Sequence, residues 1–140
     1  MEEIVKLFTQ HLNDDHRALT IKLNKVKSLG RISPEAKELL FSSKQIFMSH
    51  LKKEDEQLYP VLKKAGEKNE NAKKLADSFI CEMETISKNA ITFFNKYEKE
   101  SEGLDFAADL GNLLATLRNR IYREESVLYE MFNEIESNVS

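Results

Sequence analysis

The sequence of 140 residues has one cysteine, two prolines, four glycines and no tryptophan. A single cysteine excludes an intramolecular disulfide and any zinc motif built from several cysteines, so nothing in the chain points to an oxidising compartment. The scarcity of glycine and proline disfavours a chain rich in turns and favours long helices. No apolar run approaches the roughly 18 residues that a membrane span needs. We therefore expect a helical protein that does not insert into a membrane.

The chain also lacks an excess of basic charge, since its net charge is -3 at neutral pH. Basic and acidic residues are interleaved, as they are on solvated helix faces. Nucleic acid is not expected as a partner, because phosphate binding needs a basic surface. The first residues, Met1 to Lys6, include two glutamates and no long apolar core. We expect no signal peptide and a cytoplasmic location.

Apolar residues recur three and four positions apart along four stretches of the chain. These stretches predict helices over residues 1–29, 34–64, 72–99 and 104–135. Gly30 is expected to end the first helix and Ser33 to cap the second, while Pro60 is expected to kink the second helix or end it early. Amphipathic helices joined by short loops predict an all-α, up-down-up-down antiparallel four-helix bundle, in one domain spanning residues 1–140.

The second predicted helix carries a histidine and a carboxylate in its apolar seam. His50 and Glu54 are four residues apart, so they face the same side of a helix about one turn apart. Apolar residues continue the seam on both sides of the pair: Phe47, Leu51, Leu58, Val61 and Leu62. Two polar side chains in a buried seam need partners.

Residues 120–132 repeat the pattern of residues 50–62 without a gap. Four pairs of positions correspond: Arg120 with His50, Glu124 with Glu54, Leu128 with Leu58, and Tyr129 with Tyr59. The repeat predicts two related helical hairpins, one in each half of the chain.

Counting residues from the predicted loops places several polar side chains at one depth, near the middle of the bundle. The layer contains His16, His50, Glu54, Arg120 and Glu124, with Met83 as its apolar member. Two imidazoles and two carboxylates from three helices are suitable ligands for a first-row divalent metal. The alternative is that the histidines are ordinary core residues and that the carboxylates pair with Arg120.

Other residues near this layer have simpler expected roles. Glu82 and Glu84 flank Met83 and are alternative ligands, but they lie about 100° from the seam and are expected to face solvent. Met83 is expected to fill the core rather than to act as a thioether ligand, and Cys81 to be a packed thiol. The tyrosines are expected mainly to pack, with hydroxyl groups that can hydrogen-bond near the layer: Tyr59, Tyr122 and Tyr129.

Three motifs together resemble a known family. They are His16 in Asp-His-Arg-Ala-Leu, His50-x-x-x-Glu54 followed by Leu58-Tyr59-Pro60, and Ile121-x-x-Glu124-Glu125-x-x-Leu128-Tyr129. In these motifs the chain resembles, over essentially its whole length, the hemerythrin-like HHE cation-binding domain. The resemblance implies a four-helix bundle that holds two irons bridged by carboxylates and that binds dioxygen or senses oxygen, redox state or iron.

The resemblance assigns four metal ligands: His16 and His50 as terminal ligands of one iron, and Glu54 and Glu124 as bridging carboxylates. The histidines of the second iron fall on Met83 and Arg120, so half of the dinuclear site is expected to be lost. A guanidinium at Arg120, facing Glu54, would place a positive charge where the second metal would lie and would neutralise both carboxylates.

These features predict a cation-binding domain that holds one iron ion rather than two, for sensing or storage. Zinc or manganese would suit the same ligands. The alternative is a metal-free helical bundle that acts as a regulator or interaction module, with Arg120 replacing the second metal. Dioxygen is a candidate ligand, although carriage as bound peroxide needs two irons. We do not expect an enzyme; weak metal-dependent redox activity stays an open alternative, and an oxidase or peroxidase rests on analogy alone.

Overall fold

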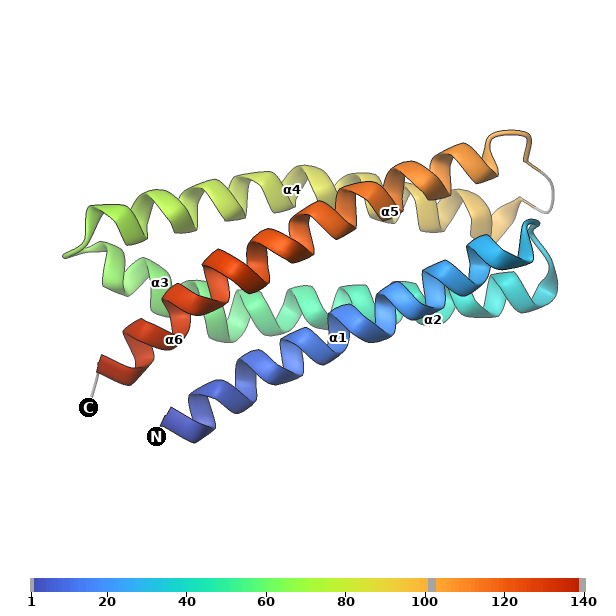
Figure 1. The fold of residues 1–140 in the computed structure, drawn as a ribbon. Helices are drawn as coiled ribbons and strands as arrows, with labels where there is room; N and C mark the ends of the chain where they lie inside the picture. The colour runs from blue at the N-terminus through green and yellow to red at the C-terminus, as the bar shows by residue number, and fades with distance from the viewer. Residues whose placement is uncertain (1, 101–102, 139–140) are drawn as a thin grey trace.

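The computed structural model describes residues 2–100 and 103–138 and shows an antiparallel four-helix bundle (Figure 1). Two of the four helices contain a short π-helical turn. In chain order the elements are α1 (Glu2–Leu29), α2 (Pro34–Lys53), η1 (Glu54–Leu58), α3 (Tyr59–Gly66), α4 (Glu70–Lys99), α5 (Phe106–Arg123), η2 (Glu124–Leu128) and α6 (Tyr129–Asn138). The described residues include no strand. The predicted all-α bundle and its up-down-up-down order are confirmed.

The helix ends follow from local sequence. Gly30 adopts φ +71°, a left-handed conformation that glycine tolerates, and it ends α1. The Ser33 hydroxyl accepts a hydrogen bond from the Ala36 amide at 3.1 Å, and Pro34 opens α2. The Asn69 side chain caps α4 in the same way. None of the helices in the described residues is long and apolar enough to span a bilayer.

Both predicted repeats contain a π turn, at corresponding positions. The Tyr59 amide donates to the Glu54 carbonyl, five residues earlier, and the Tyr129 amide donates in the same way to the Glu124 carbonyl. A π turn holds one extra residue compared with an α-helical turn, and such turns often occur at functional sites. Each turn begins at one of the two predicted carboxylates, so the change in helical geometry falls at the polar layer.

The predicted effect of Pro60 has a different form in the structure. The helix continues past Pro60 to Gly66, and the π turn lies immediately before the proline. A proline ring conflicts with the carbonyl four residues earlier in a regular α-helix, and a wider turn relieves that conflict. The second π turn has Glu130 at the position of the proline, so the turn is a feature of the repeat and not of proline alone.

The core consists of two apolar clusters, with the polar layer between them. On α1, His16 lies between Leu12 of one cluster and Leu19 of the other; along α5, η2 and α6, the polar residues lie between Leu117 and Leu128. The smaller cluster, near the termini, contains Leu12, Leu58, Tyr59, Leu62, Ala76, Phe79, Leu128, Tyr129 and Phe132. Burial of each large apolar side chain contributes about 1.5–3 kcal/mol. The clusters hold the helices in register, and the layer residues are thereby buried together.

Candidate metal centre

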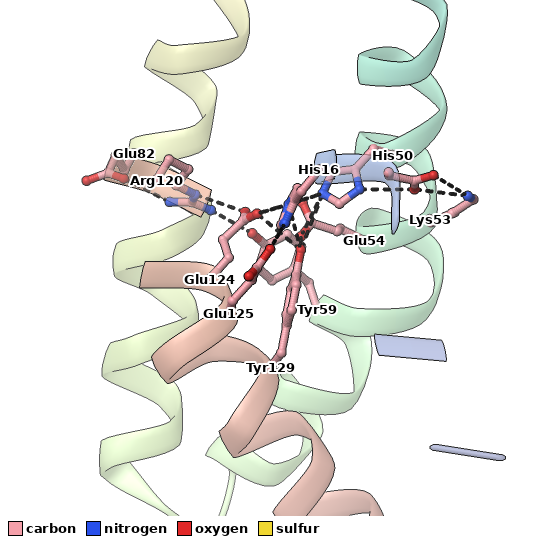
Figure 2. Close-up of polar contacts among 11 residues, drawn as sticks. His16, His50, Lys53, Glu54, Tyr59, Glu82, Arg120, Glu124, Glu125 and Tyr129 are labelled. Atoms are coloured by element: carbon pink, nitrogen blue, oxygen red, sulfur yellow. Dashed lines mark hydrogen bonds and ion pairs between the residues drawn. The ribbon is translucent and has the colours of Figure 1, made fainter. Parts of the chain in front are cut away.

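Five charged or titratable side chains from three of the four helices meet between the two apolar clusters (Figure 2). They are His16 of α1, His50 of α2, Glu54 of η1, Arg120 of α5 and Glu124 of η2, and none is more than 5% exposed. The layer predicted from the loop positions is therefore present. Met83, its predicted apolar member, belongs to the larger apolar cluster.

Three of these residues bring nitrogen and oxygen atoms close together. His16 Nε2 lies 2.8 Å from Glu124 Oε1 and 3.1 Å from His50 Nε2, and His50 Nε2 lies 3.7 Å from the same Glu124 oxygen. The three ligand atoms lie within 4.8 Å of one another, so the group is able to hold a metal ion. Imidazole and carboxylate are ligands for first-row metals.

Glu54 lies beside this group and is only partly paired. Its Oε2 lies 3.4 Å from His50 Nε2 and accepts a hydrogen bond from the Tyr129 hydroxyl at 2.8 Å. Its Oε1 is buried without a hydrogen-bond partner among the described residues. Burial and the nearby charge of Glu124 raise the pKa of Glu54 above its ordinary value. A buried carboxylate oxygen without a partner is unfavourable unless a cation or a proton accompanies it.

The Tyr129 hydroxyl lies among all four predicted ligands. Besides its bond to Glu54, the oxygen lies 3.1 Å from Glu124 Oε1, 3.2 Å from His16 Nε2 and 3.3 Å from His50 Nε2. Helical periodicity places a residue five positions after Glu124 about 140° away from it. The π turn brings Tyr129 back to the same side, so the sequence predicted hydrogen bonding near the layer but not this central position.

Carboxylates orient both imidazole rings from the outside. His16 Nδ1 donates to Glu125 Oε2 at 2.8 Å, and His50 Nδ1 donates to Asp15 Oδ2 at 3.2 Å. Asp15 is held in turn by Lys53 Nζ at 3.0 Å. Each ring therefore directs Nε2 toward the centre, an arrangement common around metal-binding histidines. Sequence analysis did not identify these carboxylates as partners, although each directly neighbours a predicted ligand.

The local charges shift the pKa values of the two central groups in opposite directions. Burial alone would lower the pKa of His50, but hydrogen bonds to Asp15, Glu124 and Glu54 raise it well above its ordinary value. Burial would raise the pKa of Glu124, but hydrogen bonds from His16 and His50 hold it below its usual range. Without a metal, the layer is therefore stabilised by the contacts of the His50 ring with the carboxylates of Asp15, Glu124 and Glu54.

Arg120 has different partners from those predicted. Its Nε donates to Glu124 Oε2 at 3.0 Å, but its other bonds go to Glu82 Oε1 and the Tyr59 hydroxyl, each at 3.0 Å, and not to Glu54. The prediction that Arg120 neutralises both carboxylates is therefore wrong, since it contacts one of them. Glu124 thus directs one oxygen to the histidines and the other to a guanidinium.

Residues on α4 also differ in part from expectation. Glu82 does not simply face solvent: its side chain is 37% exposed, and its carboxylate binds both Arg120 and Arg123. Cys81 is exposed, so the prediction of a packed thiol is wrong. Glu84 is exposed as predicted. The error at Glu82 arises because the Arg120 and Arg123 side chains reach toward α4 and bind its carboxylate at the edge of the seam.

The chain matches the family model described as Hemerythrin HHE cation binding domain over residues 7–132. This match includes every residue of the central layer. No curated protein and no solved structure matches the chain significantly.

Proposed function

The chain belongs to the hemerythrin HHE cation-binding family, and from this premise we propose that it binds one iron ion through His16, His50, Glu54 and Glu124. The observation that carries the proposal is the meeting of their four ligand groups in a layer with almost no solvent exposure. The bound ion supplies redox and ligand-binding chemistry, and the protein uses it for sensing or storage. Zinc and manganese are alternative ions for the same ligands.

The spacing of the ligand atoms fits a first-row metal. Metal bonds to imidazole nitrogen and carboxylate oxygen are about 2.1 Å long, so neighbouring ligand atoms lie about 3.0–3.4 Å apart. The contacts among His16, His50, Glu54 and Glu124 range from 2.8 to 3.7 Å. The unpaired Oε1 of Glu54 is a further oxygen that a cation would satisfy. The residues present thus fit the ion that the family implies.

The surroundings of Arg120 support one ion rather than two. Glu124 Oε2 points away from the histidines and is bound by the Arg120 guanidinium. A carboxylate that bridges two metals presents its two oxygens to two cations, and here the second cation is the arginine side chain. The side of the layer next to Glu124 Oε2 therefore holds the permanent positive charge of Arg120, which would repel a second metal ion.

Sensing is the better use of such a site, because one ion per chain is a small store. The four ligands come from three of the four helices, so an ion stabilises the folded bundle, by an amount that rises with the logarithm of the ratio of its concentration to its Kd. Occupancy then changes the stability of the bundle, which a partner is able to detect. The arrangement supports binding rather than catalysis, and dioxygen carriage as peroxide is not proposed, since it needs two irons.

Metal content per chain tests the proposal directly. Untagged protein is reconstituted anaerobically with iron(II), desalted and analysed by mass spectrometry, with zinc and manganese in parallel. We expect about one iron per chain, and none in His50→Ala. His11→Ala is the matched control, because His11 lies on α1 but is exposed. No metal in the parent, with thermal unfolding unchanged by a chelator, would refute the proposal.

One observation favours a metal-free bundle as the second candidate. Glu124 is bonded to Arg120 and His16, and Glu54 accepts a bond from Tyr129. The layer is therefore largely paired without an ion. In that case the bundle acts through its surface as a regulator or interaction module. His50→Ala would then change the stability of the protein, with no bound metal to lose.

A further inference from the structure

The Tyr129 side chain is buried at the point where the four proposed ligands meet. Tyr129 is 2% exposed, and its hydroxyl oxygen lies within 3.3 Å of a ligand atom from each of His16, His50, Glu54 and Glu124 (Figure 2). A tyrosine that merely packed would direct its ring into the apolar cluster and its hydroxyl to one partner. This hydroxyl instead faces every member of the proposed site.

The distances show which place in the site this oxygen takes. An ion at the centre would lie about 2.1 Å from each ligand atom. The Tyr129 oxygen lies 2.8–3.3 Å from the four atoms, which is the separation expected between neighbouring ligands. The oxygen therefore has the position of one more ligand and not that of the ion.

We propose that Tyr129 is a fifth ligand and that the site thereby selects ferric iron; this inference rests on the proposed function. On binding, the O–H bond of Tyr129 breaks and the oxygen donates an electron pair to the ion. The Tyr129 proton and the proton on Nε2 of the protonated His50 ring both leave to the solvent. Iron supplied as iron(III) needs no oxidant in this step. The ligands then comprise two neutral imidazoles, two carboxylates and one phenolate.

The charge of this ligand set matches a trivalent ion. Glu54, Glu124 and the Tyr129 phenolate carry three negative charges, which equal the charge of iron(III). The charged side chains around these ligands balance in number: three are positive and three are negative, namely Arg120, Arg123 and Lys53 against Glu82, Glu125 and Asp15. A buried site favours an ion whose charge balances that of its ligands, because an excess of charge in a low-dielectric interior is costly.

The internal repeat supplies a matched control residue. Tyr59 occupies the same position in the first repeat, after an equivalent π turn, and is also buried. Its hydroxyl accepts a bond from Arg120 Nη2 at 3.0 Å. Tyr59→Phe therefore also removes a buried hydroxyl from this layer, but one that contacts Arg120 and not the proposed metal ligands.

The experiment loads metal-free protein with iron(III) nitrilotriacetate and compares the parent, Tyr129→Phe and Tyr59→Phe. Iron per chain is measured by mass spectrometry, and iron-bound phenolate by its visible charge-transfer band and by resonance Raman bands that shift with ring-deuterated tyrosine. We expect one iron with the band in the parent and in Tyr59→Phe. Tyr129→Phe is expected to lose the band and to bind iron(III) about 10-fold more weakly or worse.

The possible results separate this inference from the proposed function. Iron bound to the parent without the phenolate bands would overturn the role of Tyr129 while leaving the iron site intact. Tighter iron binding by Tyr129→Phe would show that the hydroxyl competes with the ion, and would also overturn it. A parent that binds iron(II) in the anaerobic assay but takes up no iron(III) would overturn the ferric selection and leave the proposed function intact. No iron in the parent from either source would overturn the proposed function itself. If Tyr129→Phe does not fold, the labelled parent and Tyr59→Phe still decide whether a tyrosine other than Tyr59 binds the iron.

Discussion

Replacing Arg120 with methionine is expected to destabilise the metal-free protein strongly, because Glu124 then loses a buried charge partner. Both side chains are 1% exposed, and the guanidinium also lies 4.5 Å from the centre of the Phe79 ring. Methionine fills much of the same volume with an apolar chain. The substitution therefore removes the charge and its hydrogen bonds while creating only a small cavity.

The expected loss can be estimated from these contacts. Breaking a buried ion pair by removing one partner costs about 3–5 kcal/mol. The low end, about 3 kcal/mol, applies here, because His16 still bonds Glu124 at 2.8 Å. For a chain of this length, 1 kcal/mol corresponds to about 3 °C in Tm, so Tm should fall by about 10 °C.

Arg123→Met is the matched control for this prediction. Arg123 binds the same oxygen of Glu82 and lies 5.9 Å from the Phe79 ring centre, but its side chain is 38% exposed. An exposed pair contributes about 0–1 kcal/mol. Urea unfolding with a chelator present, followed by circular dichroism, measures both variants. Equal, small losses in the two variants would refute the argument that the Arg120–Glu124 pair is a buried and necessary contact.

Four further predictions concern the layer and the fold around it. Arg120→His should raise the iron content of reconstituted protein above that of the parent, toward two per chain; a content unchanged at one would show that the arginine does not displace a second ion. Glu54→Gln should leave the metal-free protein as stable as the parent or more so, because it removes a buried charge, yet it should abolish iron binding in the same assay. Because the pKa of His50 is raised in the folded protein, its protonated form stabilises the fold fully below about pH 6.5, and this stability is lost as the pH rises through the raised pKa. With a chelator present, the difference in unfolding free energy between the parent and His50→Gln should therefore be larger near pH 6 than near pH 9. A difference that does not change with pH would contradict this prediction. Ser33→Ala should cost about 1 kcal/mol through loss of the α2 cap without changing iron content, which differential scanning calorimetry and metal analysis together would test.

Local sequence patterns were sufficient to predict the helices and the depth of the polar layer. The three-and-four spacing around His16, His50 and Glu124 fixes which face each helix buries, because a regular helix repeats every 3.6 residues. Short loops then force consecutive helices to be antiparallel. Residues at equal distances from the loops must lie at equal depth, so the layer could be predicted from counting alone.

Partner choice within the layer was not predictable in this way. Whether Arg120 contacts Glu54 or Glu124, and whether Glu82 turns inward to it, depends on side-chain conformations and on which charges lose solvent together. The sequence correctly placed Arg120 and Glu124 one turn apart on the same helix. It contained no signal that the second oxygen of Glu54 would lack a partner.

The sequence by itself determined four amphipathic helices, their order, and the presence of histidines and carboxylates in the buried seams, since all of these follow from regular helical periodicity. The tertiary structure decided that Tyr129 would join them. The π turn at Glu124–Leu128 breaks the regular period and brings Tyr129 onto the side of Glu124. Because this turn departs from the regular period, only the folded bundle reveals that the Tyr129 hydroxyl lies among the four predicted ligands.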